Sequence, residues 1–295
     1  MLKRALFFST PYSLSLKDNQ MIIRTKEEPN MEKKVPIEDI GYVILEHQQT
    51  HITLPLLNAL SCHNVSVVLC GENRMPNAML MNLDSNTTQS ETYRAQIEVS
   101  EPLKKNIWKQ IVEAKIRNQA GLLNRLGKDG NKLKPYYLHV KSGDSDNREG
   151  IAAKIYWNEL FGKDFLRERE GKAPNNLLNY GYSILRAAVA RALIGSGLFP
   201  AFGIYHRNRY NAFPLADDLM EPYRPYVDEC VYYLRMQEEI ELTKEVKSKL
   251  LRVLFADTLF DKVMRPLDVG LSITTASLAK CFLEKQKKIS YPLLE

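Results

Sequence analysis

Several patterns that define common protein classes are missing from this chain of 295 residues. It has no GxxxxGK phosphate loop and no GxGxxG fingerprint, so neither P-loop nucleotide hydrolysis nor Rossmann cofactor binding has support. Its four cysteines are scattered and include no CxxC pair, which favours buried reduced thiols over a disulfide framework or a zinc site. No organic cofactor is therefore expected.

Long apolar segments are missing as well. No run approaches the roughly 18 uninterrupted apolar residues of a membrane span, and residues 1–20 lack the apolar length of a secretion signal. We therefore expect a cytoplasmic protein that does not associate with a membrane. The composition, 44% hydrophobic and 26% charged, is that of an ordinary globular protein. A length above the roughly 100–200 residues of one domain predicts two domains.

A net basic charge is missing from the first third of the chain. Residues 1–95 hold nine Lys or Arg against ten Asp or Glu, whereas the remainder holds 32 against 25. The formal net charge of +6 therefore comes from the last two thirds. An excess of this size is a weak indication of nucleic-acid binding there.

The first 80 residues carry the pattern of short strands joined by turns. Residues 12–16 and 21–23 flank the turn sequence Lys17-Asp18-Asn19-Gln20, which predicts a β-hairpin. Further strands are predicted at 5–8, 42–45 and 65–69, with a short helix over 54–60. The N-terminal region is therefore expected to be mostly β.

The polar stretch 82–90 predicts a domain boundary, and the chain beyond it carries helical periodicity. Gly195 and Gly197 should end one of these helices and leave residues 198–212 as an irregular connector. The expected fold class is α+β, with a β-rich domain over 1–90 and an all-α domain over 91–295. The main helical stripes run through residues 103–123, 177–192, 218–234, 246–260 and 277–282.

The most informative cluster consists of His206, Asp217, Asp218 and Glu221. In a helix Glu221 shares a face with either aspartate, and an imidazole with nearby carboxylates can hold a divalent cation. The same carboxylates also suit the first turns of a helix, where the macrodipole favours negative charge. Spacing alone leaves both interpretations open, and it does not choose between Asp217 and Asp218.

The segment around His206 strengthens the metal interpretation. The basic and aromatic run Tyr205-His206-Arg207-Asn208-Arg209-Tyr210 suits contacts to phosphate. Glu149 follows a polar turn and lies in the first turn of a predicted helix, where glutamate by itself is unremarkable.

At these residues the sequence resembles the Cas-one family, the CRISPR adaptation integrase. The motifs Gly197-Leu198-Phe199-Pro200, Gly203-Ile204-Tyr205-His206 and Asp218-Leu219-Met220-Glu221-Pro222-Tyr223-Arg224-Pro225 follow in the family's order. The resemblance covers nearly the whole chain and is strongest to members that accompany type II systems. It implies a small N-terminal β domain through which a homodimer forms, and an all-helical catalytic domain.

The resemblance also implies the roles of the site residues. Glu149, His206 and Glu221 are expected to ligate Mg²⁺ or Mn²⁺, and Asp218 becomes a further catalytic residue in preference to Asp217. Many relatives carry aspartate at the position of Glu221, so the longer side chain changes the reach of that ligand. The expected DNA-backbone contacts are Arg207, Arg209 and Arg224.

The activity implied by the resemblance is insertion of a short prespacer duplex into a CRISPR repeat as a new spacer, for antiviral defence. The 3′-hydroxyl of the duplex would attack a phosphodiester, and water in its place would give endonuclease cleavage. Expected partners are DNA, a second copy of the chain, the small Cas-two adaptation protein and other type II CRISPR proteins. The alternatives are a non-catalytic helical DNA-binding scaffold and a small-molecule metallohydrolase.

Overall fold

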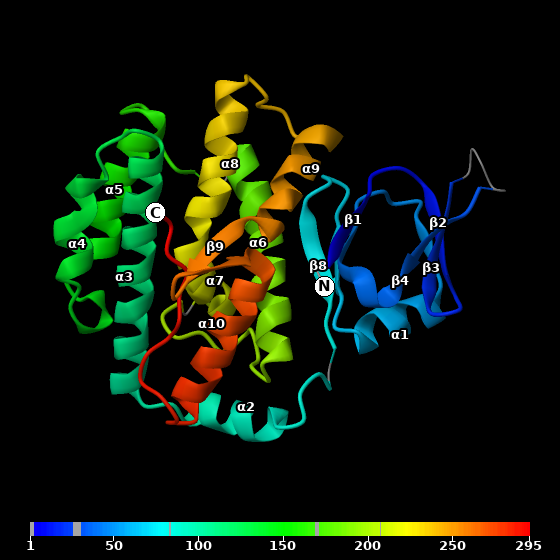
Figure 1. Ribbon diagram of the computed structural model, residues 1–295, viewed down its shortest axis with the longest axis horizontal. Coiled ribbons are helices and arrows are strands. Elements are labelled where there is room, and N and C mark those ends of the chain that lie inside the picture. Colours follow the sequence, from blue (N-terminus) through cyan, green and yellow to red (C-terminus); the bar gives the residue numbers. More distant parts are fainter. Residues whose placement is uncertain (1–2, 26–30, 83, 169–170, 207) are drawn as a thin grey trace. The chain divides into compact units, whose positions relative to one another are not determined.

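A computed structural model describes residues 3–25, 31–82, 84–168, 171–206 and 208–295 (Figure 1). The chain forms two compact units, Met1–Thr87 and Thr88–Glu295. Position 90 was the boundary expected from the sequence. Among the described helices, none combines the length and apolar composition that crossing a membrane demands.

The first unit contains a mixed four-stranded sheet in the order β1-β5-β7-β8. The three strands β1, β5 and β7 are parallel, and β8 is antiparallel to β7. All six residues of β5 are buried, as is usual for a central strand of a parallel sheet. The strand bounds are Arg4–Phe8 (β1), Ile40–Leu45 (β5), Ser66–Cys70 (β7) and Pro76–Leu80 (β8).

A second four-stranded sheet, in the order β4-β3-β2-β6, completes this unit together with helix α1. The predicted hairpin is present as β2 and β3, and Asp18 and Asn19 have φ of 50° and 55° at its turn. Asp and Asn tolerate this left-handed conformation, which a two-residue hairpin turn requires. The bounds are Lys33–Pro36 (β4), Gln20–Thr25 (β3), Tyr12–Lys17 (β2), His51–Ile52 (β6) and Leu54–Cys62 (α1).

The second unit is predominantly helical, and α6 lies at its centre in contact with α7, α8, α9 and α10 (Figure 1). Helix α6 ends at Gly195 as predicted, and Gly197 follows with φ of 75°. The helices are Gln89–Glu98 (α2), Glu101–Arg125 (α3), Lys134–Leu138 (α4), Arg148–Phe161 (α5), Asn175–Gly195 (α6), Pro214–Met220 (α7), Arg224–Met236 (α8), Lys244–Arg252 (α9) and Leu267–Phe282 (α10).

The C-terminal segment lies along α3. The buried Asn118 side chain donates to the carbonyl of Pro292 at 3.1 Å and accepts from the amide of Leu294 at 3.2 Å. Arg125 donates to the carbonyl of Glu295 at 2.7 Å. One face of α3 is therefore covered by the end of the chain, as Figure 1 also shows.

The α+β fold class is confirmed, but two helix predictions need correction. The helix expected over 218–234 is divided, because Pro222 and Pro225 lack the N–H groups that a continuous helix needs. The helix expected over 246–260 stops at Arg252, and Asp257–Phe260 forms strand β9 paired with Val263–Pro266, strand β10. The second unit therefore contains one β-hairpin and is not entirely α.

Candidate metal and phosphate site

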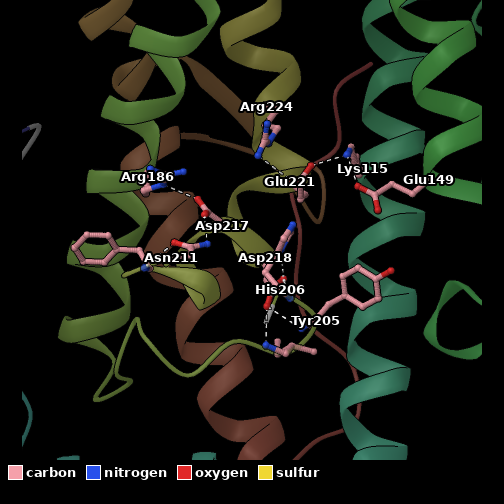
Figure 2. Close-up of polar contacts among 12 residues, drawn as sticks. Lys115, Glu149, Arg186, Tyr205, His206, Asn211, Asp217, Asp218, Glu221 and Arg224 are labelled. Carbon is pink, nitrogen blue, oxygen red and sulfur yellow. Dashed lines mark hydrogen bonds and ion pairs between the residues drawn. The ribbon is translucent and has the colours of Figure 1, made fainter. Parts of the chain in front are cut away.

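Four segments of the helical unit supply the predicted site residues, among them α7 with Asp218, and a fifth adds a residue that was not predicted (Figure 2). Glu149 lies in the first turn of α5, and His206 lies on the connector between α6 and α7. Glu221 begins the single 3-10 turn between α7 and α8. Helix α3 provides Lys115, which the sequence analysis did not name as a site residue.

The start of α5 is held by two side chains from the preceding turn. Asn147 has φ of 52° and accepts a hydrogen bond from the amide of Gly150 at 3.2 Å. The buried Asp144 carboxylate accepts from the amides of Arg148 and Glu149 at 2.8 and 3.0 Å. These bonds satisfy amides that a helix start leaves unpaired, and they fix the position of Glu149.

Lys115 joins the two predicted glutamate ligands. Its Nζ lies 2.6 Å from Glu149 Oε1 and 2.6 Å from Glu221 Oε2, the second contact being an ion pair and not an aligned hydrogen bond. Burial by itself would lower the pKa of Lys115, but the charges of Glu221 and Glu149 outweigh burial and raise it. Figure 2 shows the ammonium between the two carboxylates.

Glu221 is buried, with 3% of the residue exposed, and it has a second cationic partner. A terminal guanidinium nitrogen of Arg224 forms an ion pair with Glu221 Oε1 at 2.9 Å. Burial opposes ionisation of Glu221, yet Arg224 and Lys115 together lower its pKa below the ordinary value. The carboxylate is therefore ionised and compensated inside the protein.

Asp218 holds the histidine loop. Its carboxylate is fully buried and accepts three backbone hydrogen bonds, from Ile204 at 2.6 Å, Tyr205 at 3.0 Å and His206 at 3.2 Å. The same carboxylate lies 2.6 Å from His206 Nδ1, and this hydrogen bond raises the pKa of the imidazole. Because an ionised carboxylate only accepts, Nδ1 carries a proton, and in the neutral ring Nε2 is the nitrogen that can bind a metal.

Asp217 points to different partners. Its oxygens accept from Arg186 Nε at 2.5 Å and from the Asn211 side-chain amide at 2.7 Å. Glu221 directly follows α7 and keeps a helical backbone conformation, but its carboxylate contacts Lys115 and Arg224 and not the partners of either aspartate. The three acidic residues therefore face three separate sets of partners.

Aromatic rings support the connector from the side of α3. The Tyr205 ring stacks on Trp108 with centroids 4.1 Å apart and planes within 3° of parallel. Trp108 also meets the imidazole of His206 edge to face at 5.8 Å. The Trp108 ring is buried, so it fixes both side chains of the connector against α3.

The donor set suits a divalent metal, although in this conformation Lys115 lies between two of the predicted ligands. Within the described part of the chain, no three His, Cys, Asp or Glu side chains are gathered into a ready site. Glu149 and Glu221 nevertheless already share one cation, the Lys115 ammonium, at 2.6 Å each. Carboxylate oxygens and one imidazole nitrogen suit Mn²⁺ and are compatible with Mg²⁺.

The three predicted DNA contacts have different surroundings. Arg207 lies outside the described residues. Arg209 is exposed, and its guanidinium lies 4.7 Å from the centroid of the Tyr210 ring. Arg224 is engaged by Glu221 and lies 4.6 Å from the centroid of the Tyr182 ring, so its main contacts are within the protein.

The residues missed in the sequence carried a detectable signal. Lys115 and Asn118 lie on the otherwise apolar stripe of α3 that includes Ile111 and Leu122, where buried polar residues are uncommon without a partner. Asp144 lies four residues before the start of α5, in a stretch that had been assigned only as a turn.

Most of the chain matches known proteins. The model of a family described as "CRISPR associated protein Cas1" matches residues 6–268. A "CRISPR-associated endonuclease Cas1" of Neisseria meningitidis serogroup C (strain 8013) is 40% identical over 255 residues, covering 85% of this chain and 83% of the relative.

Solved structures share the fold. A "Casposase bound to integration product" matches with a TM-score of 0.79 and 22% identity, covering 98% of this chain and 92% of that one. A chain of a "Cas6-RT-Cas1–Cas2 complex" matches with a TM-score of 0.75 and 21% identity, covering 99% of this chain and 36% of that longer one. At these identities the likeness is one of fold.

Proposed function

Because the chain belongs to the Cas1 family of CRISPR-associated endonucleases, we propose that it inserts short DNA duplexes into a CRISPR array as new spacers. The observation that carries this proposal is the connected set of Glu149, Lys115 and Glu221 beside the His206–Asp218 pair. Charged groups of both signs, buried or partly buried, are what phosphodiester chemistry needs close to a DNA backbone.

Glu149, His206 and Glu221 are the proposed ligands of Mg²⁺ or Mn²⁺. When bound, such an ion stabilises charge on the phosphoryl oxygen and on the attacking or leaving oxygen. Asp218 keeps His206 in the Nδ1-protonated tautomer, so Nε2 stays available as a ligand. Arg224 keeps Glu221 ionised, which a ligand carboxylate must be.

The proposed reaction is a transesterification. The 3′-oxygen of the incoming duplex forms a bond to phosphorus, and the bond from that phosphorus to the 3′-oxygen of the repeat strand breaks. The attacking hydroxyl releases one proton and the departing oxygen gains one, so the number of phosphodiesters is unchanged and no nucleotide is consumed. If water replaces the 3′-hydroxyl, the same centre cleaves the strand.

The proposed partners follow from the family and from the titles of the structural neighbours. One neighbour is a casposase bound to an integration product, and another is part of a complex that contains Cas2. We propose that this chain likewise acts on DNA together with Cas2. A homodimer formed through residues 1–90, and contacts to other type II CRISPR proteins, belong to the same proposal.

Strand joining tests the function directly. A labelled 3′-hydroxyl duplex is incubated with the protein, Cas2, Mn²⁺ and a supercoiled plasmid that contains a repeat. We expect a covalent product that disappears with a 3′-dideoxy duplex or with EDTA. Joining of the dideoxy duplex would exclude the proposed nucleophile.

A matched pair of variants assigns the activity to the site. Glu149→Gln should abolish joining and cleavage, whereas Glu159→Gln, on the same helix and paired with Lys132 at the surface at 2.7 Å, should retain both. Salt-dependent DNA binding without any joining, unaffected by EDTA, would instead support the non-catalytic scaffold.

A further inference from the structure

A cavity lies beside the proposed site, on the side of the Tyr205 ring. Its volume is about 340 Å³. That is within the range of about 300–1,000 Å³ found for small-ligand pockets. It is lined by α3, by the turn before α5 and by the connector that carries His206, and the lining residues used below are Lys104, Lys105, Trp108, Ser142, Ser145 and Tyr205.

The cavity has an aromatic wall with one accessible face. Tyr205 is 50% exposed although one face of its ring is covered by Trp108. The exposed area therefore belongs to the other face and the edges of the ring. A planar ring held rigidly on one side and open on the other is a stacking platform for a nucleobase.

Other residues that line the cavity are basic and polar. Lys104 pairs with Glu101 at 3.2 Å, whereas the exposed Lys105 runs along Gly143, where an added Cβ would lie 3.2 Å from Lys105 Cγ. The hydroxyls of Ser142 and Ser145 lie in the same lining. The net charge of these side chains is positive, which favours an anionic group beside the aromatic wall.

The cavity adjoins both segments that carry predicted metal ligands. Tyr205 immediately precedes His206, and Asp218 accepts the amide hydrogens of both residues. Asp144 lies in the lining turn and caps the helix that begins with Arg148 and Glu149. A molecule in the cavity is therefore next to the reacting centre and not at a remote surface.

We propose that this cavity binds one unpaired nucleotide of the DNA substrate, with its base stacked on Tyr205 and its phosphate near Lys105. This inference rests on the proposed function, because that function supplies DNA as the ligand. A base inside a duplex is covered on both faces by its neighbours, so only an unpaired or extruded base can stack on the ring. Tyr205 thus selects DNA whose strand is open at the reacting phosphodiester.

The test places the fluorescent base 2-aminopurine at successive positions of a single-stranded extension on a duplex, at the 3′ end or the 5′ end. The intact protein is titrated with these duplexes in EDTA, so no strand is cut or joined. We expect the emission at one position to fall at least threefold on binding. This signal should be lost in Tyr205→Leu, which still covers Trp108, and kept in Tyr205→Phe.

Affinity supplies the second measurement. Tyr205→Leu should weaken binding of the extended duplex about tenfold and leave the blunt duplex unchanged. Lys105→Gln should lower the slope of log affinity against log salt by about one for the extended duplex. Tyr233→Leu, which removes a tyrosine of α8 that is also 50% exposed, is the matched control and should behave as the unaltered protein.

Two results would overturn the inference. One is the absence of quenching at every position in the unaltered protein, a test that does not depend on any variant folding. The other is an equal effect of Tyr205→Leu on blunt and extended duplexes. Strand joining is measured separately, so normal joining without stacking contradicts only this inference, and stacking without joining contradicts only the proposed function.

Discussion

Lys115 places a positive charge in a largely buried position, because only 11% of its side chain is exposed to solvent. Its ammonium is the common partner of Glu149 and Glu221, and Glu221 has Arg224 in addition. If the two carboxylates bind a divalent ion, the ammonium has to leave its place between them. On the proposed function, the residue therefore stabilises the protein without metal and would compete with the metal for the same oxygens.

Replacing Lys115 separates these effects. Lys115→Met should destabilise the protein in EDTA by at most about 3–5 kcal/mol. It removes the shared cation of the partly exposed Glu149 and of the buried Glu221, which keeps Arg224. Mn²⁺ should then raise the melting temperature of the variant more than that of the unaltered protein. Thermal unfolding in EDTA and in Mn²⁺ measures both, and Lys132→Met, which removes a surface pair with Glu159, serves as the control. Equal Mn²⁺ stabilisation of both proteins would contradict the competition.

The neighbouring aspartates offer an internally matched comparison. Asp218→Asn keeps the shape of the side chain but loses acceptor capacity for three backbone amides and the imidazole. We expect strand joining to fall about 10–100-fold, the range found when partners that orient a metal ligand are removed. Asp217→Asn, where Arg186 and Asn211 are the partners, should retain most activity. Initial rates of strand joining measure both effects. Similar losses in both variants would contradict the different roles of Asp217 and Asp218.

Among the elements, α6 and α8 pack closely at a glycine. A Cβ added to Gly181 of α6 would lie 2.4 Å from Val227 Cγ1 of α8. Gly181→Ala should therefore lower the free energy of unfolding by about 1–3 kcal/mol, despite the higher helix propensity of alanine. Urea unfolding measures the loss. In a Val227→Ala background, Gly181→Ala should lower the free energy of unfolding by less. An equal loss in both backgrounds would show that the contact with Val227 is not the source of the strain.

Three helices meet at another buried carboxylate. Asp228 of α8 accepts hydrogen bonds from Tyr156 of α5 at 2.7 Å and from Tyr182 of α6. Burial raises the pKa of Asp228 from 3.8 to about 6, despite these bonds and the nearby Arg224 and Arg167. The raised pKa means that the protonated acid is the form favoured by the fold.

The sign of the pH dependence follows from linkage. The contribution of Asp228 to stability is fully present below pH 3.8 and is lost as the pH rises through about 6. The stability of Asp228→Asn relative to the unaltered protein should therefore increase by about 1–2 kcal/mol between pH 4.5 and 7.5. Urea unfolding at both pH values tests this. A difference that stays constant or shrinks with rising pH would contradict it.

Local elements were predictable where the residues that determine them lie within a short stretch of the sequence. The β2–β3 hairpin follows from Asp18 and Asn19 at the turn, and the end of α6 follows from Gly195 and Gly197. Strand β9 was not predicted, because its apolar residues continue the helical spacing of α9. Its conformation depends on pairing with β10, which adjacent residues do not reveal.

At the scale of the whole molecule, the two compact units allow the proposed dimer interface to be tested. A fragment of residues 88–295 contains the central helix α6 and the helices packed around it, so we expect it to unfold cooperatively. If dimerisation depends on residues 1–90, light scattering should give a dimer for the full chain and a monomer for the fragment. A dimeric fragment would assign the interface to the helical unit.

The site itself was predictable only in part. His206, Asp218 and Glu221 were named from their spacing, whereas the role of Glu149 and the preference for Asp218 over Asp217 came from family resemblance. The structure gives each of them a defined set of partners. The contact of Lys115 with both glutamates was not predictable from spacing. It joins α3 to segments far along the chain, and only tertiary packing brings them together.

Helix α3 connects all of these contacts through its length. Trp108 supports Tyr205 and His206, Lys115 lies between the carboxylates, and Asn118 donates to the carbonyl of Pro222 beside Glu221 at 2.8 Å. Seven helical residues rise about 10.5 Å, and one residue turns the helix by about 100°. Inserting or deleting a single residue between Trp108 and Lys115 would therefore turn the aromatic support and the ammonium onto different faces. Substitutions between Trp108 and Lys115 should therefore be tolerated better than an insertion or a deletion there, because only the latter change the number of residues that separates the two side chains.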